Sequence, residues 1–127
     1  MRNPKWHRDE IILLLDLYFD KNLGSINSNN PKIIALSEFL NRLPIHTHRP
    51  SPQKFRNPNG IAMKLANIQA LDPNYKGKGL DAYSKLKKEV FEEFHLDIER
   101  LHKIANQIKQ KSDNCGVSNK ISTVRND

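Results

Sequence analysis

The residues best suited to chemistry lie on one side of a predicted helix over residues 58–71 and at its N-terminal edge. Four of them have side chains that can contact nucleic-acid bases: Asn57, Asn59, Met63 and Asn67. An asparagine can form two hydrogen bonds with adenine, and a methionine can contact the methyl group of thymine. The opposite side is apolar and would attach the helix to a core through Ile61, Leu65, Ile68 and Leu71. We predict that the four polar-side residues read bases, and the alternative is an ordinary amphipathic helix with a solvated face.

Positive charge is concentrated around this predicted helix. The chain carries a net charge of +7, and residues 42–78 hold seven basic residues against one acidic residue, a balance of +6. Such a cluster favours a phosphate polymer, because binding displaces counterions, whereas a merely solubilising surface is the alternative. The N-terminus of the helix also offers N–H groups to an anion. The candidate phosphate contacts are Arg49, Lys54, Arg56, Lys64, Lys76 and Lys78.

No pattern typical of a catalytic or metal site is found in the sequence. Three possible nucleophiles have no adjacent base to activate them: Ser37, Ser84 and Cys115. His46 and His48 alternate in a loop without a nearby acid, which makes a poor metal site. The segment 77–79 lacks the preceding strand and the spacing of a phosphate-binding loop. We therefore expect no enzymatic activity, no metal and no cofactor.

The composition indicates a single cytoplasmic domain. The chain of 127 residues is of ordinary domain size, and its longest apolar run, residues 11–15, is too short to cross a bilayer. The N-terminus lacks the apolar region of an export signal. The single cysteine cannot form an internal disulfide, which suits a reducing compartment. We expect no membrane contact.

Hydrophobic periodicity predicts an all-α protein of five helices, over residues 8–20, 31–43, 58–71, 84–94 and 97–111. Asn30-Pro31 and Asn57-Pro58 each combine an N-cap residue with a proline suited to the first helical turn. Trp6 is expected to fold back onto the first helix. The lysines of residues 84–94, Lys87 among them, are expected on a solvated face beside glutamates. Residues 112–127 lack apolar periodicity, which predicts a disordered tail after a helical domain over residues 1–111.

The order of the first three helices favours a helix-turn-helix-like unit. Two apolar helices precede a third that is polar and basic on its outer side, as in three-helix DNA-binding modules. The connection over residues 44–55 is longer than the usual turn of three to four residues. The fourth and fifth helices would then buttress this unit.

Two segments carry a resemblance to a known family. Residues 6–19 and residues 55–67 resemble the N-terminal region of bacterial HNH restriction endonucleases related to modified-cytosine-specific restriction proteins. Residues 36–44, 71–73, 77–80 and 89–94 fit the same pattern, and the similarity extends over residues 6–108. In that family this region precedes the nuclease and is thought to help to recognise DNA, including modified DNA. The His-Asn-His arrangement and the cysteine pairs of the nuclease itself are absent from this chain.

The resemblance implies a module that recognises double-stranded DNA for a restriction or defence nuclease, with the nuclease domain outside this chain. The alternative is a protein-interaction or dimerisation module, in which the apolar stripes of helices 84–94 and 97–111 meet a partner helix. The two hypotheses differ in their dependence on salt, because phosphate contacts weaken steeply as salt rises and apolar contacts do not.

Overall fold

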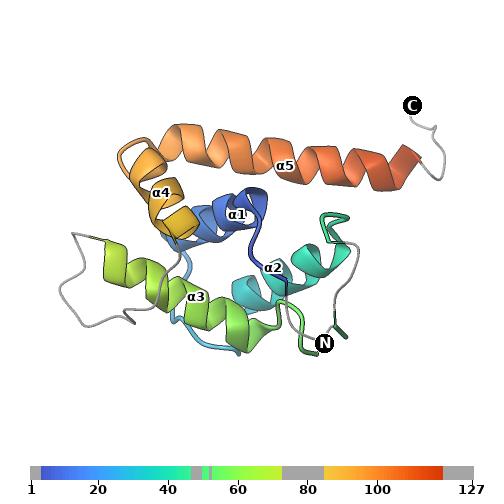
Figure 1. Cartoon of the computed structure of the whole chain (residues 1–127), viewed down its shortest axis with the longest axis horizontal. Helices are drawn as coiled ribbons and strands as arrows, with labels where there is room; N and C mark the ends of the chain where they lie inside the picture. Colours follow the sequence, from blue (N-terminus) through green and yellow to red (C-terminus); the bar gives the residue numbers. More distant parts are fainter. Residues whose placement is uncertain (1–3, 47–49, 52, 73–84, 119–127) are drawn as a thin grey trace.

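The computed structural model describes residues 4–46, 50–51, 53–72 and 85–118, with side chains up to residue 111. Over these ranges the chain is all-helical, as predicted, and contains no strand. The helices are α1 (Arg8–Tyr18), α2 (Pro31–Arg42), α3 (Pro58–Leu71), α4 (Lys85–Phe94) and α5 (Ile98–Ser118) (Figure 1). No helix in these ranges is both long and apolar enough to cross a membrane.

Two helices begin at the residues that the sequence indicates. The Asn30 side chain accepts a hydrogen bond from the Lys32 amide, and Pro31 occupies the first turn of α2. Asn57 does the same for α3 by accepting from the Gly60 amide. A side-chain oxygen at this position satisfies an amide that has no partner within the helix, and proline fits where no amide is needed. Both predicted helix starts are therefore confirmed.

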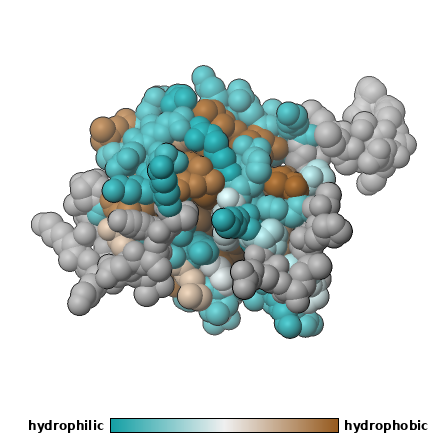
Figure 2. Space-filling model, in the orientation of Figure 1, coloured by the Kyte–Doolittle hydropathy of each residue, from teal (hydrophilic) through white to brown (hydrophobic). Residues whose placement is uncertain are grey.

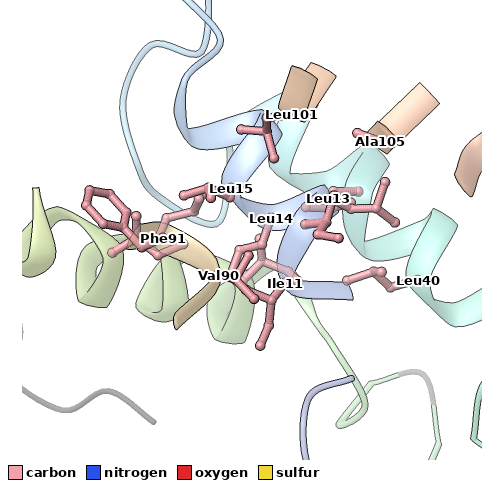
Figure 3. Packing of buried hydrophobic residues seen from close by; sticks show 14 of the residues in the cluster. Ile11, Leu13, Leu14, Leu15, Leu40, Val90, Phe91, Leu101 and Ala105 are labelled. Carbon is pink, nitrogen blue, oxygen red and sulfur yellow. The ribbon is translucent and has the colours of Figure 1, made fainter. Parts of the chain in front are cut away.

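The core is a single cluster centred on α1. Residues 11–15 of α1 are all buried, and α1 contacts each of the other four helices. α5 packs on one side of α1 and α3 on another, so that α1 lies between them (Figure 1). Leu40 of α2, Phe91 of α4 and Leu101 of α5 meet this central helix (Figure 3). One continuous apolar cluster over all five helices is the arrangement of a single domain.

The face of the molecule seen in Figure 2 is mostly hydrophilic, with apolar patches between the polar side chains and at the outline. One recess is a groove whose walls come from α1, α2 and α5 and include Leu17, Phe39 and Ile98. Acidic and basic side chains border it, among them Asp16 and Lys109.

Three predicted helix ends differ from those in the structure. α2 ends at Arg42 rather than at residue 43. α1 ends at Tyr18 rather than at residue 20. α5 continues to Ser118 instead of stopping at residue 111, so residues 112–118 are helical where a disordered tail was expected. Adding one residue to an existing helix needs only a modest propensity, whereas apolar periodicity reports packing against a core. The absence of apolar periodicity after residue 111 therefore did not mark the end of α5. Residues 119–127 lie outside the described residues.

Candidate nucleic-acid interface

Arg56 is a predicted phosphate contact that the structure places in the interior. Its side chain is only 2% exposed, and its Nε lies 2.9 Å from Oε2 of Glu10 in α1. Its Nη2 donates to the Glu10 Oε1 at 3.0 Å and to the backbone carbonyl of Pro4 at 3.1 Å. The prediction for Arg56 is therefore corrected, because a guanidinium that is buried and paired is not presented to a phosphate. Charge alone did not distinguish a surface cation from one half of a buried pair.

Aromatic rings enclose the same guanidinium. The Arg56 Cζ lies 4.3 Å from the ring centroid of Trp6 and 4.5 Å from that of Phe55, within the range of cation–π attraction. Trp6 thus packs back against the domain, and it does so on Arg56. Arg56 has a φ of 50°, a left-handed conformation that non-glycine residues rarely adopt and that needs support from the surrounding structure. The ion pair and the two rings supply that support.

Glu10 joins the start of α1 to this cluster. Its carboxylate is fully buried, accepts from the His7 amide and lies 2.8 Å from Nε2 of His46. His7 in turn caps α1 by accepting from the Asp9 amide. Burial by itself would raise the pKa of Glu10, but the hydrogen bonds from Arg56, His7 and His46 outweigh burial and lower it. This cluster, Glu10 with Arg56, His46 and Trp6, is called the buried arginine cluster below.

α3 carries three of the predicted contacts with different exposure. Asn59 and Met63 are exposed, whereas Lys64 is half-buried. Lys54, on the loop before the helix, is also exposed. α3 contains no acidic residue along its whole length. The structure therefore leaves the side chains of Lys54, Asn59 and Met63 exposed at and just before α3, where they offer cationic, amide and soft apolar groups, and it leaves Lys64 half-buried.

Two predicted base-reading residues have other roles. Asn57 uses its oxygen to accept from the Gly60 amide and its Nδ2 to donate to the Gln53 carbonyl at 2.7 Å, so both ends of its amide are engaged. Asn67 is only 5% exposed, and its buried Oδ1 has no hydrogen-bond partner in the described part of the chain. Asn67 lies four residues before Leu71, and residues four apart share a side of a helix, so Asn67 borders the apolar stripe. Both assignments are corrected.

Lys87 in α4 was expected on a solvated face, and the structure shows it buried at 3% exposure. α4 packs against α3, the helix that carries Lys64. Burial and, secondarily, the charge of Lys64 lower the pKa of Lys87 to about 8. The i,i+4 pattern of lysines and glutamates led to the prediction that Lys87 is exposed. Its burial could have been predicted, because Lys87 is three residues before the buried Val90 and shares its side of the helix.

Three predicted phosphate contacts, Arg49, Lys76 and Lys78, lie outside the described residues, as do Ser84 and the side chain of Cys115. Within the described ranges no group of three or more potential ligands could hold a metal ion. His46, weighed as a metal ligand, contacts Glu10 and Arg56 instead.

Comparisons with known protein families, with curated proteins and with solved structures find no match to this chain.

Proposed function

We propose that this chain binds double-stranded DNA through the exposed side of α3, as the recognition module of a restriction or defence nuclease. The observation that carries the proposal is that Asn59 and Met63 are exposed on α3, a helix without any acidic residue that also carries the half-buried Lys64, and that Lys54 is exposed on the loop before it. The lysines would contact phosphates, and Asn59 and Met63 would contact base edges. The association with a nuclease rests on the sequence resemblance of residues 6–19 and 55–67.

The packing around α3 supports this use of the helix. α1, α2 and α3 all contact one another, as the helices of a helix-turn-helix-like unit do. The two residues just before the N-cap of α3 are held against α2, because Ser37 donates to the Arg56 carbonyl at 2.6 Å and Asn41 donates to the Phe55 carbonyl at 3.0 Å. These bonds hold the start of α3 in one orientation before DNA arrives, which limits the ordering entropy lost on binding.

The alternative hypothesis, a partner helix on the apolar stripes of α4 and α5, finds less support. Val90, Phe91 and Phe94 of α4 are buried in the domain's own core, together with Leu101 and Ala105 of α5. These side chains are therefore already covered by the other helices of the same chain.

The test is affinity for a labelled duplex against salt concentration, in the full chain and in variants. Lys54→Ala should weaken binding to all sequences alike and lower the slope of log K against log salt by about one. Asn59→Ala should change the preference between duplexes, by about 1–3 kcal/mol if its contact is bidentate. Lys103→Ala is the matched control, because Lys103 is exposed on α5, and α5 makes no contact with α3 among the residues that the structure describes.

Two outcomes of this assay would count against the proposal. If Lys103→Ala lowers the slope and Lys54→Ala does not, α3 is not the surface that faces DNA. If the wild-type chain binds no duplex, modified or unmodified, at low salt, the proposed function is wrong.

A further inference from the structure

The groove between α1, α2 and α5 leaves apolar side chains accessible from outside the domain. It has a volume of about 650 Å³, and its lining includes Leu17, Phe39 and Ile98. Leu17 and Phe39 are half-buried, and Ile98 is 44% exposed, so the core does not cover them fully. None of the described residues that line the groove belongs to α3 or α4. The groove is therefore separate from the proposed DNA-binding helix and from the covered stripe of α4.

Both carboxylates that line the groove already have partners. The Asp16 Oδ1 lies 3.1 Å from Nδ1 of His102, and the Asp20 Oδ2 lies 2.7 Å from Nζ of Lys32. These pairs join α1, and the residues just after it, to α5 and to α2 respectively. The acidic groups of the groove are thus engaged within the chain and leave little negative charge to attract a cationic partner.

Two cations of the groove are not engaged in this way. Arg42 and Lys109 are exposed, and neither forms an ion pair within the part of the chain that the structure describes. Lys32 at the start of α2 and His102 in the second turn of α5 pair with carboxylates at the C-terminal end of α1. Arg42 ends α2, and Lys109 is about two turns beyond His102, so both lie toward the opposite end of the groove.

We propose that this groove receives an amphipathic α-helix of another protein, with carboxylates beside its apolar face. α5 rises about 1.5 Å per residue, so from Ile98 to Lys109 the groove extends about 17 Å, or about three helical turns. Apolar side chains at i, i+3, i+4 and i+7 of the partner would pack against Leu17, Phe39 and Ile98. Its carboxylates would meet Arg42 and Lys109. This inference goes beyond the proposed function and does not depend on it.

Two other occupants fit the groove less well. A second copy of this chain also carries a net charge of +7, so two copies repel each other where the groove is already positive. A small ligand needs a site that encloses most of its surface, whereas this groove is open along one side. A helix needs only one of its faces covered, which is what an open groove offers.

The first experiment measures the affinity of the full wild-type chain for a synthetic, fluorescently labelled peptide of about three turns. The peptide is stapled, because so short a helix is marginal in water. It carries leucines on one face and glutamates beside that face at both ends. One control peptide has lysines in place of the glutamates, and a second has the same residues with the leucines spread over all faces. Anisotropy should show the acidic amphipathic peptide binding at least about tenfold more tightly than either control.

Variants of the chain test whether this binding occurs in the groove. Arg42→Ala and Lys109→Ala should each weaken binding of the acidic peptide by about two- to fivefold, the usual effect of one exposed ion pair. Lys103→Ala is the matched control, because Lys103 is exposed on α5 but does not line the groove. Ile98→Asp should weaken binding by at least about tenfold, because it places a carboxylate among apolar side chains. Circular dichroism checks that each variant is folded.

A second measurement needs no variant. In isotope-labelled wild-type chain, the acidic peptide should change amide NMR shifts of α1, α2 and α5 around the groove. No binding, equal affinity for the three peptides, or shifts confined to α3 would overturn the proposal. Sedimentation of the chain alone tests the second copy. A wild-type dimer that Ile98→Asp dissociates would assign the groove to another copy of this chain and would overturn the proposal as well.

Discussion

At the residue scale, Arg56 shows how the same side chain can be assigned opposite roles from sequence and from structure. In a basic segment before a helix it reads as a phosphate contact, yet its partner is Glu10, forty-six positions away along the chain. No local sequence pattern predicts an ion pair between residues so far apart in the chain. The sequence did not predict the burial of Asn67 and Lys87 for a related reason. Each lies among polar residues on a helix, and packing against other helices determines which side of that helix is buried.

Removing the arginine should cost stability rather than DNA affinity alone. Arg56→Met would leave the Glu10 carboxylate in the interior without its charged partner, which typically destabilises a protein by about 3–5 kcal/mol. Chemical denaturation should show this loss, whereas Lys54→Met, at an exposed neighbouring position, should change stability by less than about 0.5 kcal/mol. Unchanged stability in Arg56→Met, with a lower salt slope for DNA, would restore the role that the sequence suggested.

The acid stability of the protein should depend on Glu10. Its folded-state pKa is lowered below the ordinary value of 4.5, so the unfolded chain binds its proton more readily. The stabilisation is therefore fully present above about pH 4.5 and is lost as the pH falls through the lower folded-state value. Glu10→Gln should have a flatter dependence of unfolding free energy on pH in this window, from a lower starting stability.

The control for this prediction is Asp20→Asn. The pKa of Asp20 is also lowered, first by its hydrogen bond from Lys32, but this pair lies at the surface, where solvent screens it. Its acid profile should therefore remain close to that of the wild type. Parallel profiles for Glu10→Gln and the wild type would contradict the assignment of Glu10.

At the element scale, the sequence predicts the helices well because their signals are local. Asn30 with Pro31 and Asn57 with Pro58 mark two helix starts, and the apolar stripe of α3 correctly predicts Ile61, Leu65 and Ile68 as buried. The end of α5 was missed because no residue there forces a stop. For the candidate interface, the sequence pattern predicts Lys54, Asn59, Met63 and Lys64 at the surface. The same pattern cannot show which basic side chains are buried within the domain, as Arg56 is.

The two asparagine caps should differ in strength. Asn57→Ala should destabilise the protein by about 0.5–2 kcal/mol, the usual range for an N-cap. Asn30→Ala should cost more, because Asn30 is buried and its Nδ2 also donates to the carbonyls of Leu23 and Ser25, at 2.6 and 2.7 Å. Urea denaturation of both variants gives the comparison. A larger effect at Asn57 would mean that the loop before α2 does not depend on Asn30.

At the scale of the whole molecule, binding and folding are linked. A duplex that binds only the folded chain should stabilise it by about 2.7 kcal/mol at a concentration one hundred times the Kd. Thermal unfolding with increasing duplex should show a rising Tm, and the rise should be smaller in the double variant Lys54→Ala, Lys64→Ala at the same duplex concentration. An equal rise in both proteins would place the DNA elsewhere on the surface.

The buried arginine cluster also bears on the order of events in folding. The cluster joins the segment before α1 and α1 itself to the loop before α3. These residues are far apart in the chain, with α2 between them. The cluster can therefore assemble only when the long intervening segment has been closed into a loop. Our hypothesis is that this cluster forms after the main folding barrier, because bringing its distant residues together costs loop-closure entropy. In stopped-flow denaturant jumps, Arg56→Met should therefore unfold much faster than the wild type while refolding at nearly the same rate. The Arg56–Glu10 pair would thus set the unfolding rate, and with it the lifetime of the folded chain, while having almost no effect on the folding rate.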